Sequence, residues 1–257
     1  MLTFKNTNIV FAGLSAAGIF VHIKYGGSLY IFLLLFVAYS LVLFYGCYYI
    51  ASGFFMPVIC FANTTQKVIA LSFDDGPHAA NTPRLLQILQ QAGVKAAFFC
   101  IGNRVPGNEG LLKQVVGQGH IVGNHSHSHH FWFDMFTAKQ MLADMVQADT
   151  AIQQATGLAP KLFRPPYGIM NPNLKKAIVK GGYTPIGWNV RSMDTVVKNE
   201  QKLLHNVTSK IKPGAIILFH DTSNTMLAVL PAFIQHAKEK GYEIVRLDNM
   251  LNLQTYA

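Results

Sequence analysis

Apolar positions follow two different patterns, one in the N-terminal part of the 257-residue chain and one in the remainder. No Asp, Glu, Lys or Arg occurs between Lys24 and Lys67, and the run from Leu29 to Ile50 reads LYIFLLLFVAYSLVLFYGCYYI. A helix rises about 1.5 Å per residue, so this run can cross a hydrocarbon layer about 30 Å thick. The pattern predicts an N-terminal membrane anchor over residues 1–60, with its strongest transmembrane segment at residues 29–55.

A second apolar segment, from Ile9 to Ile23, is shorter than the roughly 17 to 25 residues that a transmembrane helix usually needs. It can span a thin bilayer, lie in the interface or belong to a signal sequence. Because no convincing cleavage site follows it, we expect both apolar segments to remain in the mature protein. A single span with Lys5 and Lys24 on its N-terminal side favours a C-terminal domain outside the cytoplasm, whereas a two-helix hairpin leaves the side open. We expect a membrane protein, bound to lipid through this segment, whose main domain faces the periplasm or the cell exterior.

Beyond Lys67, short apolar runs rich in β-branched and aromatic residues alternate with longer segments of helical spacing. KVIALSF is followed by TPRLLQILQQAG and KAAFFCIG by NEGLLKQVVGQG, and the alternation continues to YEIVRL. This is typical of an α/β fold with a parallel sheet, and about seven such units in residues 61–257 favour a closed or nearly closed (β/α) barrel. Glycines are expected to end the helices in the left-handed conformation at Gly93, Gly119, Gly157, Gly181 and Gly241.

Charged residues make up only 13% of the chain, against about 25% in an average globular protein. The formal net charge of +9 suits a polyanionic partner such as cell-wall polymer, but a basic surface with no special partner explains it equally well, since no run of Lys or Arg exceeds two. The three cysteines have no paired spacing and indicate no metal site. We expect no nucleic-acid partner, and no protein partner is predicted.

Two clusters of polar residues directly follow predicted strands. SFDDGP contains the adjacent carboxylates Asp74 and Asp75, which cannot both ionise cheaply without the counter-charge of a divalent cation or an arginine. In NHSHSHH, His125 and His129 are four residues apart, a spacing that predicts two imidazoles on the same side of a helical turn. Two histidines and one aspartate form a common metal-ligand set that leaves a position open for water. Taken alone, SFDDGP can also be an acidic turn. NHSHSHH alone can also be a histidine-rich surface loop or a metal buffer.

Two further clusters follow later predicted strands. In FRPPYG, Pro165 and Pro166 fix the backbone and remove two amide donors, so the amide of Tyr167 is the first that can point into a site. Arg164 precedes them and can pair with a carboxylate. In IILFHD, His220 ends a buried strand at a place suited to a general acid, although a lone histidine there is more often structural. Because parallel strands end on one face, all four clusters can meet.

Taken in order, SFDDGP, HSHSH, RPPYG and LFH resemble the first, second, third and fifth motifs of the polysaccharide deacetylase family, also called NodB-like or carbohydrate esterase family four. The resemblance covers nearly all of residues 67–250. It implies a distorted (β/α) barrel of about seven strands. It also implies one divalent metal ion, zinc in the first place with cobalt, manganese or nickel as alternatives. The implied reaction is hydrolysis of acetyl groups from N-acetylated sugars of a peptidoglycan- or chitin-like polysaccharide.

The resemblance further implies a role for each matching residue. The metal ligands would be Asp75, His125 and His129. The catalytic groups would be the base Asp74, its partner Arg164, the acid His220 and the Asp194 that orients this acid. The groups facing the acetyl oxygen and methyl would be Pro165, Tyr167 and Leu218. The remaining histidines of this region are expected outside the ligand set, namely His120, His127 and His130.

The chain departs from the family at the fourth motif, which is commonly Asp-x-x-Asp-Trp. The matching stretch follows Trp188 and keeps the second aspartate as Asp194, but Arg191 and Thr195 replace the first aspartate and the tryptophan. An O-acetylated xylan-type glycan or a lipid-linked glycan is therefore an alternative substrate. A catalytically inactive, membrane-tethered glycan-binding or metal-buffering protein is an alternative of another class, and the complete set of base, acid and ligands argues against it.

Overall fold

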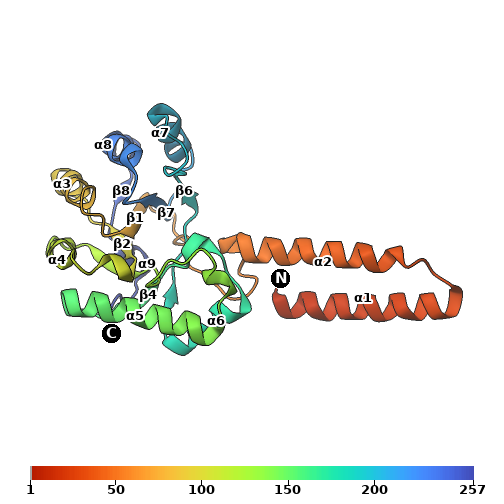
Figure 1. Ribbon diagram of the computed structural model, residues 1–257. Helices are drawn as coiled ribbons and strands as arrows, with labels where there is room; N and C mark the ends of the chain where they lie inside the picture. Colours follow the sequence, from red (N-terminus) through yellow and green to blue (C-terminus); the bar gives the residue numbers. More distant parts are fainter. Residues whose placement is uncertain (1) are drawn as a thin grey trace.

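The computed structural model describes residues 2–257, which form a helical hairpin joined to an α/β body (Figure 1). The hairpin consists of α1 (Phe4–Tyr25) and α2 (Tyr30–Tyr48). The helices of the body are α3 (Thr82–Ala92), α4 (Glu109–Gly117), α5 (Ala138–Thr156), α6 (Pro172–Gly181), α7 (Glu200–Thr208), α8 (Asn224–Glu239) and α9 (Leu247–Leu251). Single 3-10 turns are η1 (Ile50–Ser52), η2 (Gly102–Arg104), η3 (Phe133–Met135) and η4 (Pro166–Gly168).

A parallel sheet forms the centre of the body. Its strands are β1 (Val68–Gly76), β2 (Ala97–Cys100), β3 (Ile121–Asn124), β4 (Leu162–Phe163), β5 (Thr184–Pro185), β6 (Val190–Arg191), β7 (Ala215–His220) and β8 (Glu243–Ile244). The strand order is β5-β4-β3-β2-β1-β7-β6, and β8 also pairs with β1. The path of seven strands curls into a half-barrel that ends at β5 and β6, so the predicted α/β barrel is confirmed in an incomplete form.

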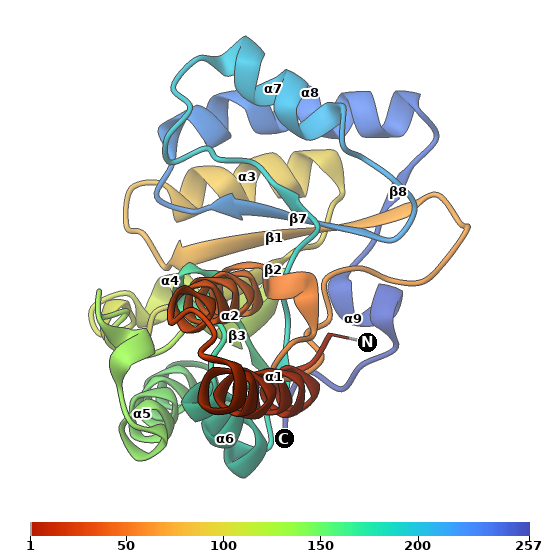
Figure 2. The same ribbon diagram turned by 90° about the vertical axis from the view of Figure 1, so that its right-hand side faces the viewer.

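The two central strands, β1 and β7, are buried along nearly their whole length. Helices α3 and α8 lie over them (Figure 2), and apolar side chains of both helices pack against the strands. A strand covered on both faces needs a continuous apolar run, which VIALSF and AIILF supply. Apart from Ser72 within β1, polar residues begin only at the carboxyl ends of these strands, where Asp74 and His220 are register partners.

The connector between the hairpin and β1 is packed into the body. It connects β5, at one end of the half-barrel, with β7, the strand next to the other end, because Ile59 pairs with Ile186 next to β5 and Phe61 pairs with Ala215 in β7. Four apolar side chains of this stretch are buried, namely Ile50, Phe54, Phe55 and Cys60. The connector therefore fixes the hairpin to the sheet.

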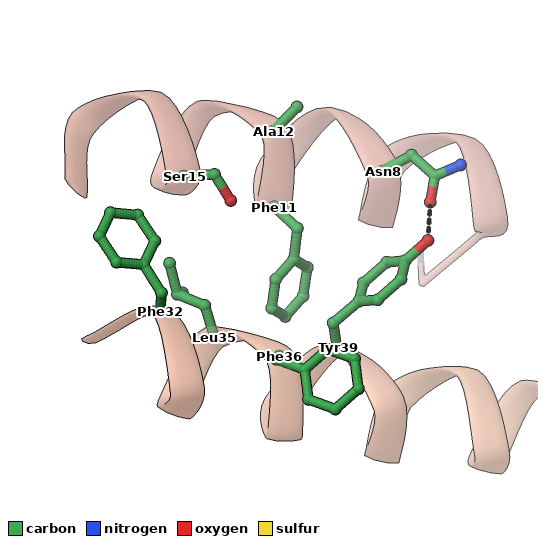
Figure 3. Close-up of a pocket in the computed structure, with 8 residues that line it drawn as sticks. All are labelled: Asn8, Phe11, Ala12, Ser15, Phe32, Leu35, Phe36 and Tyr39. Carbon is green, nitrogen blue, oxygen red and sulfur yellow. Dashed lines mark hydrogen bonds between the residues drawn. The ribbon is translucent and has the colours of Figure 1, made fainter. Parts of the chain in front are cut away.

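The hairpin projects from the body as two antiparallel helices (Figure 1). Across it, the hydroxyl of Tyr39 donates a 2.7 Å hydrogen bond to Oδ1 of Asn8 (Figure 3). Most apolar side chains point outwards, with exposed fractions of 78% for Ile23, 68% for Leu34 and 67% for Phe36. Helix α1 is 22 residues long and therefore extends beyond the short predicted apolar segment. By length and composition, both helices can cross a membrane.

The predicted helix ends are mostly confirmed, with one correction. Gly93 and Gly157 are left-handed C-caps, and Gly119 and Gly241 adopt positive φ one residue beyond the caps of their helices. Gly181 is still helical, and the left-handed residue that ends α6 is Gly182, with φ of 69°. Where two glycines are adjacent, the sequence alone does not decide which of them turns the chain.

Candidate active site

Polar residues from several strand ends line one pocket of about 190 Å³ at the carboxyl edge of the sheet. This volume is below the roughly 300–1,000 Å³ of sites that enclose a drug-sized ligand, so the pocket has room only for a small chemical group. The predicted site residues that line it are Asp74, Asp75, His125, His129, Pro165, Tyr167, Leu218 and His220. The other two predicted residues, Arg164 and Asp194, lie behind it and bond to Asp74 and His220.

Asp75, His125 and His129 each direct one potential ligand atom to a common point. Nε2 of His125 lies 3.6 Å from Oδ1 of Asp75, and Nε2 of His129 lies 3.5 Å from the same oxygen. Ligands bound about 2.0–2.2 Å from a tetrahedral ion are separated by about 3.3–3.6 Å, so these distances fit one shared ion. All three ligand atoms lie within 4.8 Å of one another. The residues present therefore fit a divalent metal ion, and three protein ligands leave a position for another molecule.

Both imidazoles are oriented toward the shared point. His125 is buried and donates its Nδ1–H to the carbonyl of Arg164 over 2.8 Å, which directs Nε2 to Asp75. Burial and the nearby His125 lower the pKa of His129 to about 4, against the opposite effect of Asp75. His129 is therefore neutral at pH 7, the form in which histidine binds metals.

The histidine segment forms an irregular loop, so the predicted helical turn is wrong. Ser126 and His129 adopt left-handed backbone conformations, with φ of 65° and 44°. Asp144 of α5 holds the loop, because its carboxylate accepts hydrogen bonds from the backbone N–H groups of His127 (2.6 Å) and Ser128 (3.2 Å). Contacts to α5, and not helical periodicity, bring the two imidazoles together.

Asp74, which lines the pocket, forms a buried ion pair with Arg164, which lies behind it. Nη1 of Arg164 donates to Oδ1 of Asp74 over 2.7 Å, and both side chains are almost fully buried. The guanidinium also lies 4.0 Å from the Phe99 ring and donates to further groups, namely Ser72 Oγ and the carbonyls of Ile186 and Gly187. Burial lowers the pKa of Arg164 and Asp74 opposes this, but a guanidinium keeps its proton in proteins. Oδ2 of Asp74 lies 3.8 Å from Nε2 of His125 and therefore faces the Asp-His-His cluster.

Asp194 holds His220 through two hydrogen bonds. Nδ1 of His220 donates to Oδ1 of Asp194 over 2.7 Å, and the backbone N–H of His220 donates to Oδ2 over 2.9 Å. Ser192 also donates to Oδ1, so both carboxylate oxygens accept hydrogen bonds. Burial alone would lower the pKa of His220, but the hydrogen bond and charge of Asp194, with the charges of Asp74 and Asp75, outweigh it and raise the pKa. His220 is thus biased toward the protonated form.

Tyr167 follows the two prolines in a left-handed conformation, with φ of 59° and ψ of −2°. A non-glycine residue in this region costs on the order of 1–3 kcal/mol and persists only where its surroundings fix it. Its ring lies edge-on to His129 at 4.8 Å, and a Cβ at Gly168 would lie 2.5 Å from the Trp188 ring. The Tyr167 amide N–H has no acceptor within residues 2–257.

Further residues, which were not predicted from the sequence, support the site from behind. Ser72 bonds to Arg164, and Asp144 holds the histidine loop. Asp221 is buried, accepts a hydrogen bond from Thr82, and lies so close to Gly76 that a Cβ there would be 2.6 Å from its Oδ2. Burial raises the pKa of Asp221 to about 6. The available signal was a polar residue within or directly after an apolar strand, as for Ser72 and Asp221.

The sheet and pocket define a class of protein, a parallel α/β half-barrel with carboxylates and imidazoles gathered at one edge. Residues 61–186 match the polysaccharide deacetylase family. Peptidoglycan-N-acetylglucosamine deacetylase PgdA of Listeria monocytogenes is 34% identical over 202 residues, which cover 79% of this chain and 42% of that protein. A peptidoglycan-N-acetylglucosamine deacetylase of Bacillus cereus is 36% identical over 193 residues, covering 71% of this chain and 70% of that protein.

The solved structure of the Bc1960 peptidoglycan N-acetylglucosamine deacetylase superposes with a TM-score of 0.73 at 28% identity, covering 78% of this chain and 95% of that one. The chain therefore belongs to the polysaccharide deacetylase family. It spans 42% of the length of the Listeria protein, so that likeness covers only a part of the relative.

Proposed function

We propose that the chain is a metal-dependent polysaccharide N-deacetylase, which hydrolyses the acetamide of N-acetylated sugars in a peptidoglycan- or chitin-like glycan. The observation that supports it most is the cluster of Asp75, His125 and His129 beside two groups suited to proton transfer, Asp74 and His220. Family membership, and relatives whose names give peptidoglycan as the substrate, agree with this proposal.

Asp75, His125 and His129 would hold the ion. Two imidazoles and one carboxylate suit zinc, which we favour, and also cobalt, manganese or nickel. When bound, such an ion polarises an acyl oxygen and lowers the pKa of coordinated water from about 15.7 toward about 7.

Asp74 and His220 would move the protons. Oδ1 of Asp74 is tied to Arg164, so Oδ2 is the atom that can take a proton from the attacking water. The amine of an acetamide leaves only when protonated. Nδ1 of His220 is bound to Asp194, so Nε2 is the atom that can deliver this proton to the departing nitrogen.

The residues after β4 and at the end of β7 would recognise the acetyl group. Pro165 and the following proline fix the turn that presents the Tyr167 amide, whose N–H can donate to the carbonyl oxygen as negative charge develops there. One preorganised donor of this kind contributes about 3–4 kcal/mol to catalysis. Leu218 lines the pocket and offers an apolar contact for the methyl group.

Residues 1–60 would anchor the catalytic domain of residues 61–257 to a membrane. The outward-facing apolar side chains of α1 and α2 would be unfavourable in water and are suited to lipid. If both helices span, the N-terminus and the body lie on the same side of the bilayer. A peptidoglycan-like substrate lies outside the cytoplasm, so we propose that the body faces the periplasm or the cell exterior.

Acetate release by the full-length protein in detergent tests the activity. We expect release from N-acetylglucosamine oligomers and none from acetylated xylan. Release from xylan alone would replace the proposal with an O-acetyl esterase. Oligomer binding without release, in protein loaded with metal, would indicate an inactive glycan-binding protein.

A further inference from the structure

Arg191 is a cation in the active-site pocket without an anionic partner. It ends β6, pairs in register with Leu218 of β7, and lines the same pocket as that residue. Its Nε is buried and has no hydrogen-bond acceptor, and no hydrogen bond or ion pair within residues 2–257 involves its guanidinium. A buried donor without an acceptor is unfavourable, and more so when the group is charged.

The carboxylates around the pocket are already engaged. Asp74 is paired with Arg164, Asp194 with His220, and Asp75 belongs to the Asp-His-His cluster. Arg191 instead lies 5.8 Å from the centre of the Trp188 ring, which keeps the guanidinium against the pocket wall. The short side chain of Thr195 also lines the pocket and leaves room beside it.

We propose that Arg191 binds a carboxylate on the substrate glycan, close to the acetamido group that is cleaved. The inference rests on the proposed deacetylase function and narrows its substrate to an acidic glycan. A guanidinium presents two parallel N–H donors that match a carboxylate, and desolvation in a pocket strengthens such a pair. Because Arg191 lies opposite Leu218, which would contact the acetyl methyl, the carboxylate belongs to the acetylated sugar or to its direct neighbour.

Substrate selectivity tests this assignment. Acetate release is measured with four glycans of equal length: an N-acetylglucosamine oligomer, an oligomer alternating with N-acetylmuramic acid, the same oligomer with its carboxyl groups converted to methylamides, and an oligomer alternating with glucuronic acid. Each is given to the wild type, Arg191→Gln, Arg191→Lys and the exposed control Arg84→Gln. Because glucuronic acid carries no acetamide, a preference for the glucuronic glycan would place the carboxylate on the neighbour of the acetylated sugar.

The wild type should prefer one free-carboxylate glycan over the neutral ones, mainly through KM. Arg191→Gln should reduce this preference by about 10- to 100-fold, the effect of losing charge-assisted hydrogen bonds. Arg191→Lys should keep part of the preference, and Arg84→Gln should keep all of it. A wild type that does not discriminate, or an equal loss on all four glycans in Arg191→Gln, would overturn the assignment.

Binding separates this inference from the deacetylase proposal itself. Calorimetric titration of the free-carboxylate and methylamide glycans into Asp74→Asn protein, with and without Arg191→Gln, needs no turnover. If no glycan releases acetate but Arg191 still determines the affinity for the carboxylate, the proposed deacetylation is refuted and the carboxylate subsite at Arg191 is supported. If affinity does not depend on Arg191, the subsite is refuted whatever the enzyme does.

Discussion

At the residue scale, two ionisable side chains are suited to the different tasks proposed for them because their surroundings differ. Asp74 is fixed by a buried guanidinium that occupies one carboxylate oxygen and leaves the other toward the Asp-His-His cluster. His220 is fixed by a carboxylate, which favours its protonated form. One site thus offers a proton acceptor and a proton donor on neighbouring strands, as acid–base hydrolysis requires.

Replacement of the acceptor should separate metal binding from turnover. Asp74→Asn keeps the ligands Asp75, His125 and His129, so metal content should be unchanged while acetate release falls by about 10²- to 10⁴-fold. Elemental analysis and an acetate assay on the same sample measure both. The control Asp248→Asn, at the start of α9 and outside the pocket, should stay near wild type. Wild-type turnover in Asp74→Asn would refute the assignment of the base.

The pH profile tests the donor. The pKa of His220 is raised above its usual range, so its proton is held to higher pH than in an ordinary histidine and is lost as the pH rises through that pKa. Activity should therefore fall on the alkaline side, and the stabilisation from the pair with Asp194 should fade over the same rise in pH. Asp194→Asn removes the charge that raises the pKa, so the alkaline limb of kcat/KM should move to lower pH. An unmoved limb would mean that another group supplies the proton.

At the element scale, the strands could be predicted and the loop that carries the metal ligands could not. Apolar runs in the sequence predict strands β1 and β7, since both faces of the sheet are covered there. The spacing of His125 and His129 indicated a helix, but left-handed residues and a contact to α5 decide the loop. Strand β6 has two residues and leaves no periodic signal, although it positions Arg191.

The support of this loop by α5 makes a prediction at the same scale. Asp144→Ala removes the acceptor of two backbone N–H groups behind the histidine loop, so metal affinity should fall by about 10- to 100-fold, as for other groups that orient ligands. Competition with a chromogenic chelator measures it. Asp144→Asn keeps one acceptor oxygen and should lose less affinity. Wild-type metal affinity in both variants would show that the histidine loop keeps its conformation without Asp144.

At the scale of the whole molecule, the hairpin is fixed to the α/β body at several points. The backbone N–H of Phe4 bonds to the Phe54 carbonyl over 2.9 Å, and that of Met170, close to Tyr167, bonds to the Cys47 carbonyl at the end of α2 over 3.0 Å. A membrane-embedded hairpin would therefore hold the pocket in one orientation to the bilayer. The sequence predicted an apolar anchor, but not this attachment, because the bonding groups are backbone atoms from distant segments.

Membrane attachment can be tested with vesicles. The full-length chain should remain bound at about 1 M salt, where electrostatic attraction is screened within about 3 Å. Leu41→Lys, near the middle of α2, should reduce insertion, since a lysine at the helix centre costs about 2.5–3.5 kcal/mol, whereas Gln66→Lys outside the hairpin should not. Release of the wild type by salt would contradict a spanning anchor.

The central claim is that Asp75, His125 and His129 share one catalytic ion, and metal content measured together with acetate release tests it most directly. The wild type should hold one divalent ion per chain, lose activity on chelation and regain it with zinc. His129→Ala should lose both ion and activity, while the exposed control His205→Ala keeps both. Full acetate release by metal-free protein, or wild-type metal content in His129→Ala, would contradict the account.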